Sequence, residues 1–150
     1  MTDLEVRQGV LDTIGESIDQ LGAALAALGV AYELLDERSQ DRLEDELFGP
    51  VQKGYGRAKK TYADFAARYG LAAAEFQQPS STSGSRDVRR FLDSAIEAVD
   101  EAEEVLIHLQ DSGQTVDYGD ADLRAGLASV REVVGNVRAS SRLFIRTLGR

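Results

Sequence analysis

Apolar residues recur with a seven-residue period in several stretches of the chain, and this period predicts α-helices. In the first stretch, two apolar series are offset by three residues, as are the a and d positions of a heptad. One series is Leu4, Leu11, Ile18, Leu25 and Tyr32, and the other is Ile14, Leu21, Leu28 and Leu35. The pattern predicts a helix over about residues 3–37.

The same pattern returns after Gly49 and Pro50, with aromatic residues in one series and mostly smaller residues in the other. The two series are Phe48, Tyr55, Tyr62, Tyr69 and Phe76, and Val51, Ala58, Phe65 and Ala72. They predict a helix over about residues 50–77, with Pro50 in its first turn, where a missing N–H group is tolerated. Leu43 and Leu47 do not fit this register, so we predict a separate short helix over about residues 40–48.

The second half of the chain predicts two more long helices. Residues 77–85 are mostly small and polar, which is typical of a flexible connection. A helix over about residues 86–110 follows, with Ser85 as its N-cap, and another is predicted over about residues 120–148. No stretch alternates with period two over more than a few residues, so the chain is predicted to be all-α.

Long helices with short connections pack most simply as an antiparallel up-down-up-down four-helix bundle, here a single domain over residues 1–150. The net charges of residues 1–49, 50–78, 79–119 and 120–150 are −9, +3, −6 and +3. In the predicted order, each acidic helix borders two basic helices and faces the other acidic helix across the diagonal. The charge pattern therefore favours this order over one that places the first and third long helices side by side.

Composition narrows the classes of function. The chain has no cysteine, which excludes a disulfide scaffold and a thiolate metal site. Its net charge of −9 disfavours nucleic acid and anionic membranes as partners, and the basic helices are expected to pair with flanking acidic ones. The most apolar stretch, Leu21 to Leu35, is shorter than the roughly 20 residues that span a bilayer. The acidic start of the chain lacks the basic flank of a secretory signal, so we expect a cytoplasmic location.

Candidate catalytic and metal-binding groups are few. The predicted inward positions carry no Asp, Glu or His, and the single histidine, His108, is predicted to point outward. The acidic run of Asp100, Glu101, Glu103 and Glu104 is expected on a solvated face, paired with basic neighbours. We therefore expect no catalytic residues, no metal site and no cofactor.

Glycines and tyrosines form a second candidate feature. Gly15, Gly22 and Gly29 recur every seven residues, although each glycine costs a helix about 1 kcal/mol relative to alanine. They could form a groove that simply accommodates the aromatic series of the second long helix. Alternatively, they could leave a pocket for a flat apolar ligand, lined by the hydroxyls of Tyr55, Tyr62 and Tyr69, or form a contact between subunits.

The first helix also carries an outer apolar stripe, formed by Ala23, Ala27, Val30 and Leu34. A helix that is apolar on every side is buried on every side, so we predict that this stripe docks on a second copy about a two-fold axis. Alternatively, the segment 40–48 folds back over it. The expected function is that of a non-catalytic helical bundle acting through protein–protein contacts, as a homo-oligomer or with another helical protein. The alternative is a small-molecule-binding or sensory bundle that uses the Gly/Tyr seam.

Overall fold

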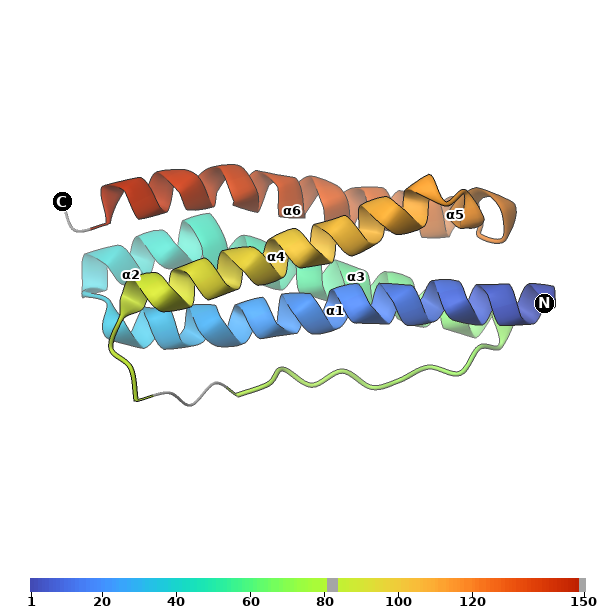
Figure 1. The fold of residues 1–150 in the computed structure, drawn as a ribbon, viewed down its shortest axis with the longest axis horizontal. Coiled ribbons are helices and arrows are strands. Elements are labelled where there is room, and N and C mark those ends of the chain that lie inside the picture. The colour runs from blue at the N-terminus through green and yellow to red at the C-terminus, as the bar shows by residue number, and fades with distance from the viewer. Residues whose placement is uncertain (81–83, 149–150) are drawn as a thin grey trace.

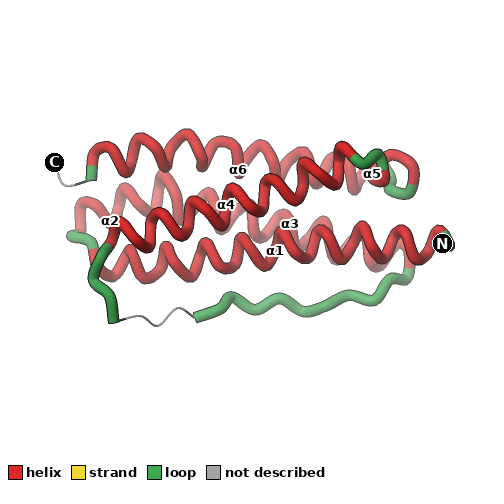
Figure 2. Tube along the Cα trace, viewed as in Figure 1, coloured by secondary structure: helices red, strands yellow, loops and turns green. Residues whose placement is uncertain are grey.

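The computed structural model describes residues 1–80 and 84–148, and every regular element in this part of the chain is helical (Figure 1, Figure 2). The long helices are α1 (Asp3–Leu34), α3 (Gly49–Tyr69), α4 (Val88–Asp111) and α6 (Ala121–Thr147). The short elements are α2 (Glu37–Leu43), the π-helical turn η1 (Glu44–Phe48) and α5 (Gln114–Asp117). The predicted all-α class is confirmed, and the four long helices pack as a bundle around one apolar core.

The order of the helices differs from the predicted one. Both α1 and α6 pack against α3 and α4, and the most extensive packing between helices is that of α1 on α4. Arg7 of α1 donates to the carbonyl oxygen of Tyr118, and Arg68 at the end of α3 pairs with Asp120, so these segments share one end of the bundle. Consequently α3 and α4 run in the same direction, and the first and third long helices lie side by side (Figure 1). The up-down-up-down order predicted from charge is therefore wrong.

Small residues explain why α1 and α4 pack so closely. Ser17, Ala24 and Ala31 recur every seven residues on α1 and are fully buried, as is Ala102 on α4. The Ser17 hydroxyl donates to the Ala102 carbonyl oxygen at 3.1 Å, which requires the two helix backbones to be near each other. Such close packing contributes more to the stability of the helix pair than exposed ion pairs do, since each exposed pair is worth about 0–1 kcal/mol.

The predicted short helix is not separate from the second long helix. The elements α2, η1 and α3 follow one another without a break from Glu37 to Tyr69. In η1 the Gly49 N–H donates to the Glu44 carbonyl oxygen, and a Cβ atom on Gly49 would lie only 2.9 Å from that oxygen. The π turn ends two residues before Pro50, which lacks the N–H group that an ordinary helical turn would use. It also shifts the register, so that Leu43 and Leu47 become buried.

The helix predicted over residues 50–77 ends at Tyr69, not at residue 77. Gly70 adopts a left-handed conformation with φ of 64°, and its N–H donates to the Ala66 carbonyl oxygen. The chain then continues in extended form, and we call residues 71–80 the strap. The predicted flexible loop 77–85 is thus part of a longer connection, and its residues 81–83 lie outside the described residues. The helix after it is capped by Asp87, whose side chain accepts from Arg90 N–H, and not by Ser85.

The strap runs along α1 and makes paired contacts with it (Figure 1). The Gln8 side chain binds both backbone groups of Ala72, donating to its carbonyl oxygen and accepting from its N–H group, each at 2.9 Å. Further along, Phe76 lies against Gly15 and Pro79 lies against Gly22. The spacing fits because seven helical residues advance about 10 Å, as do three extended residues. The strap therefore carries the chain back along the bundle and makes α3 and α4 parallel.

A Phe76→Ala variant is expected to release the strap while the helices stay folded. The Phe76 ring meets the Tyr62 ring edge-on, with 4.8 Å between the centroids, and such a pair contributes about 0.5–1.5 kcal/mol. We expect faster amide hydrogen exchange at the Ala72 N–H, which donates to the Gln8 side chain, and at the Ala74 N–H, which donates to the Tyr62 hydroxyl. Gln77→Ala, at an exposed strap position, is the control. Unchanged exchange in the Phe76 variant would contradict this account.

No helix in the described ranges is both long enough and apolar enough to cross a membrane.

Candidate functional site

The arrangement of helices separates the charges of the molecule. The neighbouring helices α1 and α4 carry six and seven acidic residues, with only one and two basic residues. The neighbouring helices α3 and α6 carry five basic residues each, with one and two acidic residues. One side of the bundle is therefore acidic and the other basic. The sequence also suggested that acidic neighbours neutralise the basic helices, but α3 and α6 are neighbours of each other. The expectation that no nucleic acid binds therefore rests on the net charge of −9.

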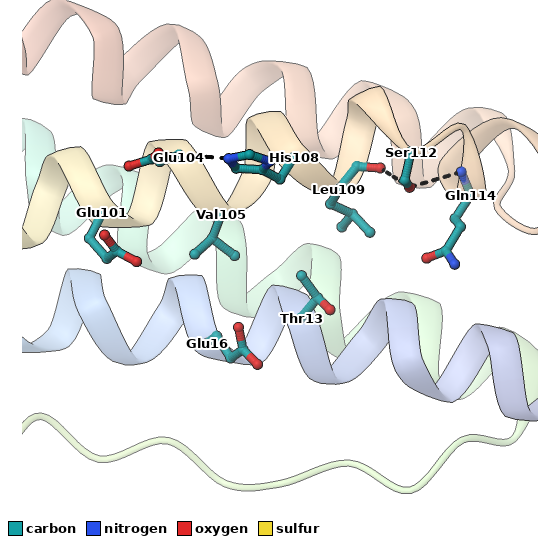
Figure 3. A pocket seen from close by; sticks show the side chains of 9 residues that line it. All are labelled: Thr13, Glu16, Glu101, Glu104, Val105, His108, Leu109, Ser112 and Gln114. Carbon is teal, nitrogen blue, oxygen red and sulfur yellow. Dashed lines mark hydrogen bonds and ion pairs between the residues drawn. The ribbon is translucent and has the colours of Figure 1, made fainter.

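A groove of about 450 Å³ lies between α1 and α4 on the acidic side (Figure 3). Glu16 reaches it from α1, and Glu101 and Glu104 reach it from α4. Val105 and Leu109 line the groove between these carboxylates. No cation among the described residues pairs with Glu16 or Glu101. The groove thus combines an apolar lining with a concentrated negative charge, and this combination suits a Lys or Arg side chain.

Two hydroxyls and the histidine of the groove have partners within the chain. The Thr13 hydroxyl donates to the Gly9 carbonyl oxygen at 2.9 Å, and the Ser112 hydroxyl donates to the Leu109 carbonyl oxygen at 2.6 Å. His108 lies outward as predicted, 78% exposed, with its Nε2 atom 3.7 Å from a Glu104 oxygen. Both hydroxyls donate to backbone carbonyl oxygens and not to a general base.

The predicted position of Glu103 is wrong. Together with its acidic neighbours it was expected on a solvated face, but it is only 7% exposed. Its carboxylate pairs with the Arg138 guanidinium of α6 at 2.5 Å, and the same guanidinium binds Asp100 at 2.9 Å. The arginine therefore joins α4 to α6 where the acidic side of the bundle meets the basic side. Gly135 of α6 lies beside the Glu103 carboxylate, where a Cβ atom would be 3.7 Å from a carboxylate oxygen.

The structure brings most of the Gly/Tyr seam together and fills it with the strap. A Cβ atom on Gly15 would lie 3.5 Å from both the Phe76 and Tyr62 rings, and one on Gly22 would lie 3.5 Å from Pro79. Gly29, by contrast, has open space beside it. Aromatic and proline rings therefore lie against two glycines of the series, at distances where a Cβ atom would make ordinary van der Waals contact, and the steric interpretation stays a prediction.

The three tyrosines of the seam have different hydroxyl environments. The Tyr62 hydroxyl accepts from the Ala74 N–H, and the Tyr69 hydroxyl donates to Asp120. The Tyr55 hydroxyl makes no hydrogen bond with the described residues. Burial raises the pKa of Tyr55, and the nearby Asp19 carboxylate raises it further. Its ring lies under the Lys59 ammonium group, 4.5 Å from the ring centroid.

The outer stripe of α1 obtains much of its cover from the same chain. Ala27 is 6% exposed, and Val30 and Leu34 pack against the core. Ala23 and Ala27 border a surface groove whose other wall includes Pro79 of the strap and Phe91 of α4. The role of this stripe as an interface stays a prediction, but little of its surface is left for a partner.

No group of three or more His, Cys, Asp or Glu side chains in residues 1–80 and 84–148 is arranged to hold a metal ion. Glu16 was missed as a site residue because its role depends on α4 lying next to α1.

Comparisons with protein-family models, with curated proteins and with solved structures find no match for this chain.

Proposed function

We propose that this chain is a non-catalytic helical-bundle protein that acts through protein–protein contacts, and that the α1/α4 groove binds a basic helical segment of a partner. One observation supports the proposal most strongly: α1 and α4, both acidic, lie side by side and leave Glu16 and Glu101 without cations. Carboxylates held close together across an apolar groove repel each other, and a basic side chain bound between them lowers this repulsion. The proposal includes a cytoplasmic location, which rests on the sequence alone.

A lysine-rich amphipathic helical peptide tests the groove. The triple variant Glu16→Gln, Glu101→Gln and Glu104→Gln is expected to weaken its binding at least tenfold, because three carboxylates that face the bound cations are neutralised. The measurement is fluorescence anisotropy of the labelled peptide at 50 mM and 300 mM salt. Binding to the unaltered chain should fall as salt screens the charges.

A variant with the same net charge provides the control. Asp3→Asn, Glu33→Gln and Glu132→Gln neutralise three exposed acids outside the groove, and this variant should bind the peptide nearly as well as the unaltered chain. Equal weakening in both triple variants would mean that binding follows net charge, and the groove proposal would then fail. Small-molecule binding at the Gly/Tyr seam has no comparable support, because Phe76 and Pro79 occupy it.

A further inference from the structure

The helical rod from Glu37 to Tyr69, made of α2, η1 and α3, has opposite charges in its two parts. Up to Phe48 its exposed charged residues are mainly acidic: Glu37, Asp41, Glu44 and Asp45, with Arg38 as the exception. From Gly49 on they are mainly basic: Lys53, Arg57, Lys60 and Arg68, with Asp64 as the exception. The sign changes at Gly49.

These charges follow the outer side of the rod. The buried residues Leu43, Leu47, Val51 and Tyr55 recur every four residues. The residues Asp41, Asp45, Lys53 and Arg57 share that spacing but are offset by two residues, and all four are exposed, so they lie on a different side of the rod from the buried series. Gly49, which is half-buried, lies midway along this series, four residues from Asp45 and from Lys53.

The series is complementary to itself under two-fold symmetry. A two-fold interface brings the same surface of two copies together, so each contact must be favourable in both directions. If two rods cross antiparallel at Gly49, Asp45 of one copy meets Lys53 of the other, and Asp41 meets Arg57. Each pair then forms twice.

The charged groups in question are available for such contacts. Asp41, Asp45 and Lys53 take part in no ion pair among the described residues, and Arg57 donates only to the Ser129 hydroxyl, at 2.7 Å. A large apolar side chain of α6 is exposed as well. Leu143 of α6 is 54% exposed and precedes Phe144, whose ring lies under the Arg42 guanidinium of α2.

We infer that two copies of the chain associate through this rod about a two-fold axis that passes near Gly49. The partner that binds this surface is a second copy of the chain, because the acidic part of one rod faces the basic part of the other. The inference deepens the proposed function, since it names a partner for protein contacts. It uses the outer side of α2, η1 and α3 and leaves the α1/α4 groove free.

Charge reversal tests the inference in the full chain by sedimentation velocity at 0.15 M salt. The unaltered chain should sediment at about twice its mass of 16.3 kDa. Lys53→Glu with Arg57→Glu makes the series wholly acidic, and Asp41→Lys with Asp45→Lys makes it wholly basic. Each double variant alone should dimerise at least tenfold more weakly because like charges then face each other. An equimolar mixture of the two should restore the dimer, since every crossing pair is again opposite in sign.

The controls separate this interface from the groove. Glu16→Lys with Glu101→Lys reverses charges on the acidic side and should leave the dimer intact. Circular dichroism checks that each exposed substitution leaves the helices folded. A monomeric unaltered chain at 100 μM, or a mixture that stays monomeric, would overturn the two-fold interface. Loss of peptide binding in the groove variant is measured separately, so either proposal can fail without the other.

Discussion

Ala24→Leu is expected to lower the free energy of unfolding by about 2–3 kcal/mol, one of the two largest effects we expect from a single substitution. Ala24 is fully buried and lies two turns along α1 from Ser17, whose hydroxyl reaches the Ala102 backbone of α4. Three extra carbon atoms cannot fit between helices this close without moving one of them. Urea titration followed by circular dichroism measures the change.

Ala26→Leu is the matched control for this substitution. Ala26 is on the same helix but only half-buried, and it borders the groove beside Pro79. A leucine there has open space, so we expect a change of about 0.5 kcal/mol or less. If both variants were equally stable, the close packing of α1 on α4 would not be what holds these helices together.

The heptads predict the inward positions of the long helices well, but not which helices are neighbours. Leu11, Ile14 and Ile18 on α1, for example, are fully buried as predicted. Neighbour choice was inferred from charge, and exposed charges contribute too little to decide it. The stronger signal was the buried series of small residues, Ser17, Ala24 and Ala31, because small side chains permit the closest approach of two helices.

The strap shows how one pattern can fit two conformations. Phe76 continues the aromatic heptad of α3, so periodicity alone extends that helix past residue 70. Gly70 ends the helix instead, and Phe76 still reaches the same seam because the extended chain follows α1. The decisive information is the left-handed glycine, which a heptad count does not consider.

The candidate groove was predictable only in part. Glu101 and Glu104 were correctly expected to be exposed, and so was His108. They line one groove with Glu16 only because α1 lies next to α4. The predicted helix order did not make α1 and α4 neighbours, so it did not bring these residues together. Glu103 was misplaced for the same reason, since its burial requires Arg138 of α6 to approach from the adjoining helix.

Asp120→Ala is expected to lower the free energy of unfolding by about 2–3 kcal/mol at neutral pH. The Asp120 carboxylate caps α6 by accepting from the Leu123 N–H at 2.7 Å, and it accepts two hydrogen bonds from Arg68, at 2.6 and 2.8 Å. It also accepts from the Tyr69 hydroxyl at 3.1 Å. One side chain thus joins the end of α3 to the start of α6, and alanine removes all of these bonds. Thermal and urea unfolding measure the loss.

The stability that is lost in Asp120→Ala should become smaller as the pH falls. Burial alone would raise the pKa of Asp120, but the hydrogen bonds from Arg68, Leu123 and Tyr69 outweigh it and lower the pKa below its ordinary value of 3.8. The stabilisation is therefore complete above that value and disappears as the pH falls through the lowered pKa of the folded state. The difference between the unaltered chain and Asp120→Ala should be constant from pH 5 to 7 and shrink below about pH 4. Asp122→Ala, in the same turn of α6, should change stability by about 0.5 kcal/mol or less. A difference that grew on acidification would show that the carboxylate does not act through its charge.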